Sequence, residues 1–277
     1  MKLLSKPNPK DGWYEIPPSE AQKILEDQGR NRPLSEWWAS ILAEDIASGE
    51  YEMNGEPLIF DESGVLLDGQ HRLRACVIAN KPLRTYVVFG VPRKFFDTLD
   101  QGRKRTAGHV EAMAGTHHAN ATAAVVKKII EHDVLGERYG NEKFRRGVPP
   151  WQVRAFMRKH KPDVEASVGL VKGYQAKLGK SLPPAAVGFV HYRAAKKDPG
   201  KASAWLHALA TMEGLSMKTG GSAILLLRRR LTKAIETGEK VDASERTALL
   251  AKTWLAFHND DPIAQLRWAR GEKFPAI

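Results

Sequence analysis

The chain has 277 residues, enough for two ordinary domains, and its hydrophobic (42%) and charged (27%) fractions exclude a disordered or fibrous protein. No run of 18 apolar residues occurs and the N-terminal stretch is too polar for a signal peptide, so we expect a cytoplasmic protein without a membrane span. The single cysteine, Cys76, excludes an internal disulfide and a multi-cysteine metal site.

The net charge of +11 is distributed unevenly along the chain. Residues 1–115 contain 15 Lys and Arg against 17 Asp and Glu, whereas residues 116–277 contain 28 against 15. A basic surface of this size attracts polyanions, nucleic acid first among them. We therefore expect the second part of the chain to contact nucleic acid, although a merely solvated basic surface would give the same count.

Residues 1–115 are predicted to form a small domain of helices and strands after an irregular lead-in over 1–18. A short helix is expected over 19–28. A second helix is expected over 35–49, where Ser35 is placed as the N-cap. The apolar residues of this second helix keep helical spacing and should pack on a core: Trp37, Trp38, Ile41, Leu42 and Ile46.

A strand, a turn and a second strand are predicted over 57–67, because two short apolar runs flank turn residues. The next residues, Asp68 and Gly69, end the strand pattern and open a helix. The β-branched and aromatic run 83–91 is the best strand candidate in the chain. Helical pieces over 93–114 complete the first domain.

The second domain, residues 116–277, is predicted to be all helical with an extended tail over 263–275 that returns as a strand or an arm. The overall class is therefore α+β, a small α/β domain followed by a helical one. The expected helices are 121–134, 151–159, 164–178, 185–196, 202–212, 222–236 and 244–257.

The turn from strand to helix at Asp68, Gly69, Gln70, His71 and Arg72 has the character of an anion site. A helix N-terminus offers unbonded N–H groups and a positive dipole end to phosphate, and the Arg72 guanidinium adds a planar donor fork. Gly69 permits close approach of the backbone, and His71 supplies hydrogen bonds or proton transfer. Asp68 either caps the helix or acts toward Mg²⁺ or a substrate hydroxyl.

Two neighbours of this turn are given no role in it. Arg74 lies two positions after Arg72 and so points to another side of the helix. Cys76 shares a helix face with Leu73 and Val77, which favours a small buried side chain over a nucleophile.

The segment 64–75 resembles the phosphate-binding box of the ParB N-terminal and sulfiredoxin-like superfamily, in the branch with the sequence Asp-Gly-Gln-His-Arg. Upstream, Arg32-Pro33 before a helix that ends at Gly49 resembles the first box of that superfamily. The boxes stand in the family's order and spacing, and the resemblance covers roughly residues 15–115.

The resemblance implies an α/β fold that binds a nucleoside triphosphate or diphosphate, with Gln70, His71 and Arg72 near the phosphates and Arg32 approaching from the first box. The superfamily has no single activity. Its members include CTP-dependent DNA clamps, ATP-using sulfiredoxins, kinases of free serine, and DNA-modification proteins of bacteria and mobile elements, which suggests a phage or plasmid context.

Two departures from the family narrow the choice. Sulfiredoxins need a cysteine where this chain has Gln70, so their sulfinic-acid chemistry does not transfer. The clamps carry a Glu-Asn-x-x-Arg third box, and this chain has Leu99 to Thr106 in that place. In this segment Asp100 is a candidate metal or hydroxyl partner and Arg103 and Arg105 are candidate phosphate partners; alternatively, it is a basic loop capped by Asp100.

The basic residues of the second domain supply the candidate nucleic-acid contacts, although each could instead lie on a solvated helix face. The densest basic stretch includes Trp151, as is typical of single-strand binders. The candidates are Lys143, Arg145, Arg146, Arg154, Arg158, Arg228 and Arg229.

No Walker loop, GxSxG, HExxH or dinucleotide-binding fingerprint occurs. We expect an enzyme that binds ATP or CTP with Mg²⁺ and hydrolyses the nucleotide or transfers a phosphoryl group. It would act on or with nucleic acid, and we favour DNA over RNA. Asp68, His71 and Arg72 would be its catalytic residues, and Asp68 and Asp100 would hold the metal. The alternatives are a non-catalytic, nucleotide-switched DNA-binding regulator and a metal-dependent DNA nuclease; a homodimer is left open.

Overall fold

The structure, a computed structural model, describes residues 9–27, 33–49, 51, 53, 55–98, 105–141, 147–269 and 271–277. It divides the chain into two compact units, unit 1 (Met1–Arg103) and unit 2 (Lys104–Ile277). Unit 1 contains a four-stranded sheet and unit 2 is helical in its described part, so the expected α+β class is confirmed. The expected boundary after residue 115 falls inside unit 2, because helix α4 (Ala107–Met113) packs on other helices of that unit.

The sheet of unit 1 has the strand order β1-β4-β2-β3. The expected lead-in contains a strand that hydrophobic spacing did not reveal, because it is short and lies at the sheet edge. This strand, β1, pairs antiparallel with β4, with Trp13 opposite Tyr86. Strand β2 runs parallel to β4 and forms an antiparallel hairpin with β3. The strands are β1 (Gly12–Ile16), β2 (Leu58–Asp61), β3 (Leu66–Asp68) and β4 (Leu83–Val91).

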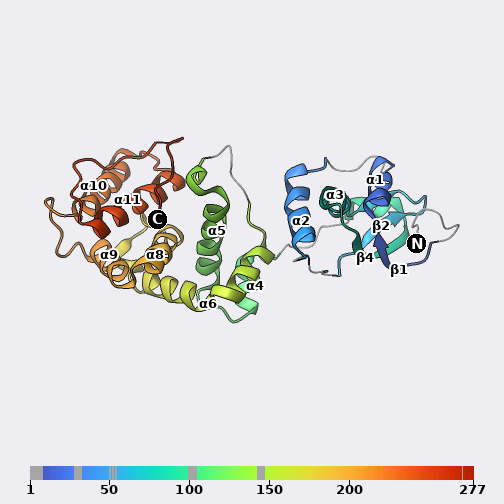
Figure 1. Cartoon of the computed structure of the whole chain (residues 1–277), viewed down its shortest axis with the longest axis horizontal. Helices are drawn as coiled ribbons and strands as arrows, with labels where there is room; N and C mark the ends of the chain where they lie inside the picture. Colours follow the sequence, from blue (N-terminus) through green and yellow to red (C-terminus); the bar gives the residue numbers. More distant parts are fainter. Residues whose placement is uncertain are drawn as a thin grey trace. The chain divides into compact units, whose positions relative to one another are not determined.

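Helix α3 (Gln70–Ala79) lies between α2 (Glu36–Ser48) and the strands, with α1 (Pro18–Glu26) beside it (Figure 1). Alternate strand residues and the inner faces of α1, α2 and α3 form the core, as period-two and helical spacing predict. That core comprises Tyr14, Ile16, Ala21, Ile24, Ala43, Ile46, Leu58, Phe60, Leu66, Leu73, Ala75, Cys76, Leu83 and Val87.

The expectation that Trp37 packs on this core is wrong, because its side chain is 47% exposed. Trp37 belongs to the first turn of α2, whereas the buried residues of that helix begin at Ala39. The exposed indole therefore lies at the N-terminal end of α2.

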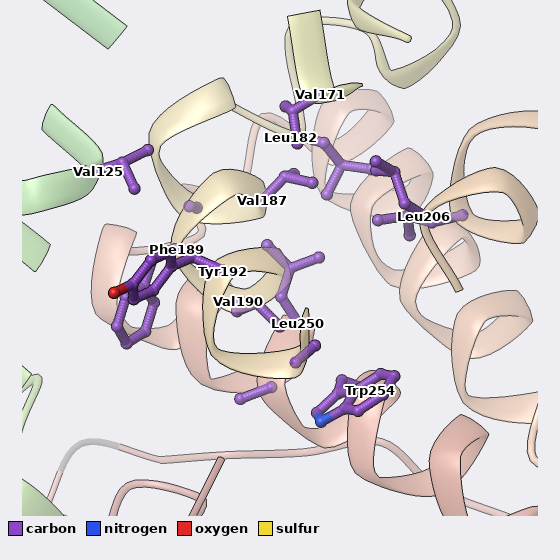
Figure 2. Close-up of a cluster of buried hydrophobic side chains, with 14 of the residues drawn as sticks. Val125, Val171, Leu182, Val187, Phe189, Val190, Tyr192, Leu206, Leu250 and Trp254 are labelled. Atoms are coloured by element: carbon purple, nitrogen blue, oxygen red, sulfur yellow. The ribbon is translucent and has the colours of Figure 1, made fainter. Parts of the chain in front are cut away.

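Unit 2 is organised around α8, which packs against α5, α6, α9 and α11. Figure 2 shows Val187, Phe189 and Val190 of α8 between Val125 of α5 and Leu250 of α11. Besides α4, the described helices of unit 2 are α5 (Ala119–Leu135), α6 (Pro150–Gly173), α7 (Gln175–Leu178), α8 (Pro184–Lys197), α9 (Pro199–Thr211), α10 (Ser222–Thr237) and α11 (Ala243–Asn259). Unit 2 also contains the 3₁₀ turn η3 (Gly136–Arg138), and unit 1 contains the 3₁₀ turn η2 (Arg93–Thr98).

The expected helices 151–159 and 164–178 are joined in the structure as α6, which continues through Pro162. A proline inside a helix removes one N–H donor and crowds the preceding turn. Here Met157 and Val164, on either side of it, are both buried. Tertiary packing therefore overrides the local signal for a break.

The C-terminal tail is an extended arm that packs on unit 2. Leu266, Trp268 and Phe274 are buried, and the Phe274 N–H donates to the Glu137 carbonyl at 2.8 Å. No strand is assigned in the described residues 261–269 and 271–277.

Among the helices that the structure describes, none combines the length and the hydropathy that a bilayer span requires.

His191 is a polar exception in the core of unit 2. Its side chain on α8 is only 2% exposed, and within the described chain neither ring nitrogen has a hydrogen-bond partner. Burial lowers the pKa of His191 from 6.5 to about 4, because the protonated ring would lose its hydration.

This shift predicts that the chain loses stability on the acid side. The unfolded chain takes up the proton below about pH 6.5 while the folded chain resists it, so stability is complete above that pH and falls toward pH 4. Between pH 7 and pH 4.5 the wild type should lose about 2 kcal/mol more than the variant His191→Leu in urea unfolding. Identical losses for the two proteins would contradict the assignment.

Candidate functional site

The turn between β3 and α3 depends on a glycine. Gly69 has φ 107° and is the N-cap of α3, and a Cβ at this position would lie 2.1 Å from Leu58 Cδ2. Backbone of this kind is open to glycine and strained for other residues. The Asp68 carboxylate does not cap the helix, which removes the capping alternative for this residue.

Arg72 holds this turn to the rest of unit 1. Its side chain is nearly buried, and its Nη1 donates to the carbonyl of Glu56. Its Nη2 donates to the carbonyl of Pro57 at 2.8 Å and to Asp68 Oδ2 at 3.1 Å. The guanidinium is thus directed into the protein, where two carbonyls and the Asp68 carboxylate accept its hydrogen bonds.

His71 connects the beginnings of two helices. The Ser35 N–H donates to His71 Nε2 at 3.0 Å, although the two residues are 36 positions apart. Ser35 is the N-cap of α2 as predicted, and its Oγ accepts from the Trp38 N–H at 3.3 Å. The first turns of α2 and α3 therefore meet at His71.

One turn along α3, Arg74 fixes the same pair of helices. Its Nε lies 3.1 Å and 3.0 Å from the two carboxylate oxygens of Glu36. Arg74 thus points to α2 rather than into the turn, as its position relative to Arg72 predicted. The pair also neutralises the one acidic side chain in the first turn of α2.

A cavity of about 340 Å³ opens beside this ion pair. Helices α1, α2 and α3 all contribute to its wall, which combines apolar and polar groups. The lining residues are Gln22, Leu25, Glu26, Leu34, Glu36 and Arg74.

Of the remaining predicted nucleotide and metal residues, the structure describes Gln70 and Arg105. Gln70 is buried, at 2% exposure, whereas Arg105 is exposed and belongs to unit 2. Arg32, Asp100 and Arg103 lie outside the described residues.

The described part of the chain has no group of three or more His, Cys, Asp and Glu side chains placed to hold a metal. Mg²⁺ commonly takes only one or two protein carboxylates when nucleotide phosphates and water complete its shell. Asp68, whose side chain is 28% exposed, fits that limited role.

Two of the arginines expected to contact nucleic acid make internal contacts. Arg228 donates to the carbonyls of Leu178 at 3.2 Å and Leu209 at 2.6 Å, and burial lowers the pKa of its guanidinium. Arg154 reaches the fully buried carboxylate of Glu111 at 3.5 Å.

Arg158 and Arg229 are exposed, as a contact residue must be. The other three candidates, Lys143, Arg145 and Arg146, lie outside the described residues.

Cys76 is confirmed as a buried side chain. Its thiol donates to the Lys81 carbonyl at 3.0 Å, and burial raises its pKa to about 11. A thiol held protonated in this way is a poor nucleophile at neutral pH.

Sequence reasoning did not identify the Ser35 amide or the Glu36–Arg74 pair as parts of the site. The sequence indicates the N-cap at Ser35, but the contact between the Ser35 amide and His71 is set by the packing of α2 on α3.

Comparison of the chain with models of protein families, with curated proteins and with solved structures gave no match.

The internal bonds of Arg72 predict a large cost for its conservative replacement. The variant Arg72→Lys keeps the charge but cannot serve two carbonyls and a carboxylate in one plane, so unit 1 should lose about 2 to 4 kcal/mol of stability. The matched control Arg74→Lys alters a more exposed pair and should cost at most about 1 kcal/mol. Denaturant unfolding of both variants measures the two losses. Equal losses of stability would contradict the claim that the Arg72 guanidinium holds the turn to the rest of unit 1.

Proposed function

We propose that unit 1 binds a nucleotide through its phosphate groups at the point where α2 and α3 begin, and that unit 2 binds nucleic acid. The observation that carries the first half is the bond from the Ser35 N–H to His71 Nε2, which brings two helix N-termini to one point. Each N-terminus has about half a positive charge and backbone donors that its own helix does not use. Together they favour an anion with several oxygens.

The neighbouring cavity suits the rest of a nucleotide. Leu25 and Leu34 offer apolar surface, while Gln22 and Glu26 offer hydrogen-bonding groups of the kind that ribose hydroxyls require. Because Glu26 is acidic, whereas Arg74 pairs with Glu36 at the first turn of α2, the phosphates belong at the helix ends and the uncharged sugar and base belong in the cavity.

The arrangement favours nucleotide-controlled binding over phosphoryl transfer. His71 Nε2 accepts a backbone N–H, and Arg72 donates to two carbonyls and Asp68. His71 and Arg72, two of the three predicted catalytic residues, are therefore engaged in hydrogen bonds that hold the fold together. ATP or CTP with Mg²⁺ near Asp68 would act as a conformational ligand, as in the clamp branch of the ParB and sulfiredoxin-like superfamily that the motif resembles.

The second half of the proposal rests on charge. Unit 2 contains 30 Lys and Arg against 16 Asp and Glu, whereas unit 1 contains 13 against 16. A net charge of this size attracts the phosphate backbone of DNA or RNA.

A thermal-shift panel of ATP, ADP, CTP and GTP with Mg²⁺ tests the nucleotide half. A ligand at about 100 times its Kd adds about 2.7 kcal/mol to the native state, so one or more nucleotides should raise the Tm of the wild type by several degrees. The variant His71→Asn should lose most of this rise, and His118→Asn, at an exposed histidine of unit 2, should keep it.

A Tm that no nucleotide moves would overturn the nucleotide half. Phosphate release by the wild type that Asp68→Asn abolishes would instead establish phosphoryl transfer. DNA cleavage without nucleotide would establish the nuclease alternative.

A further inference from the structure

The chain contains two long stretches without a carboxylate side chain. Residues 166–197 and 214–235 have no Asp or Glu, and both carry several Lys and Arg. The first contains the end of α6, α7 and α8, and the second contains all of α10 except its last two residues. A surface built from both would have basic side chains with no acidic side chain of its own among them.

Arg228 brings these two stretches together. From α10 it donates to the carbonyls of Lys177 at 3.4 Å and Leu178 at 3.2 Å, at the C-terminal end of α7. The helix ends at α7 and α9 would otherwise present carbonyl oxygens, which repel anions. By taking up these carbonyls and that of Leu209, Arg228 makes this junction compatible with an anion.

Three exposed basic side chains adjoin the contacts of Arg228 along the chain. Lys177 and Lys180 lie on α7 and in the turn after it, and Arg229 follows Arg228 on α10. None of the three makes an ion pair with a residue that the structure describes. One carboxylate, Glu213, lies near the other end of α7, where His207 holds it at 3.2 Å and Tyr174 holds His207 at 3.0 Å.

We infer that Lys177, Lys180 and Arg229 form the surface of unit 2 that binds a nucleic-acid phosphodiester backbone, with Arg228 as its positioning residue. This inference rests on the proposed nucleic-acid binding and names its location. This surface differs from the basic stretch of α6, where Arg154 pairs with Glu111 and Lys161 lies 3.9 Å from Glu165. Lys177, Lys180 and Arg229, by contrast, make no ion pair with a carboxylate that the structure describes.

Fluorescence anisotropy with the full-length chain tests the surface. The probes are a labelled DNA duplex of about 20 base pairs and a single-stranded RNA of about 20 nucleotides, titrated at about 50 to 200 mM salt. The test variant combines Lys177→Ala, Lys180→Ala and Arg229→Ala. The control combines Lys159→Ala, Lys240→Ala and Arg267→Ala, which removes the same charge from exposed positions on other segments.

The test variant should bind more than about tenfold more weakly, and the slope of log K against log salt should fall by about 2 to 3, one for each lost phosphate contact. The control should stay within a few-fold of the wild type. A variant that keeps the charges, Lys177→Arg with Lys180→Arg and Arg229→Lys, should restore the affinity, and melting curves confirm that all three fold. A loss on both probes shows that the shared backbone is recognised; a loss on one probe assigns the surface to DNA or to RNA.

The outcomes separate the inference from the function beneath it. If the wild type binds nucleic acid and the test and control variants weaken it equally, or neither does, the inference is wrong and the proposed function stands. If the wild type binds neither probe, the nucleic-acid half of the proposed function fails and the inference fails with it.

Discussion

The buried guanidinium of Arg72 is the interaction on which unit 1 depends. It bonds two carbonyls just before β2 and the carboxylate at the end of β3, and it emerges from the first turn of α3. One side chain thus fixes the segment that enters the hairpin, the strand that leaves it and the helix that follows. Because Arg72 is fixed, its neighbour His71 reaches Ser35, and the first turns of α2 and α3 meet. The candidate phosphate site is a consequence of this tether.

Unit 2 uses an arginine in the same way. Arg228 takes up carbonyls from α7 and α9, and the adjacent Arg229 remains exposed. Arginine suits this task because its planar fork serves several acceptors while its charge persists at every physiological pH. In both units an arginine is used internally, and the proposed ligand contacts are assigned to a neighbour in the chain: His71 beside Arg72, and Arg229 beside Arg228.

Local patterns in the sequence predicted much of the fold. The N-cap at Ser35, the turn at Gly69, the strand after residue 82 and most helices of unit 2 follow from capping, glycine and hydrophobic spacing. The edge strand at Trp13 and the helix that continues through Pro162 were not predicted, because partners distant in sequence stabilise them. The candidate sites could be predicted only in part. The sequence shows the motif around Gly69, but the inward direction of Arg72 and Arg228 depends on carbonyl groups that are distant in the chain.

A backbone ¹⁵N NMR titration with Mg²⁺ and the nucleotide that raises the Tm most tests the central claim directly. If phosphates bind where α2 and α3 begin, the largest amide shifts will fall on Ser35 to Trp38 and on Gly69 to Arg72, and tripolyphosphate alone will reproduce most of them. Saturable nucleotide binding that leaves both of these turns unshifted would contradict the account.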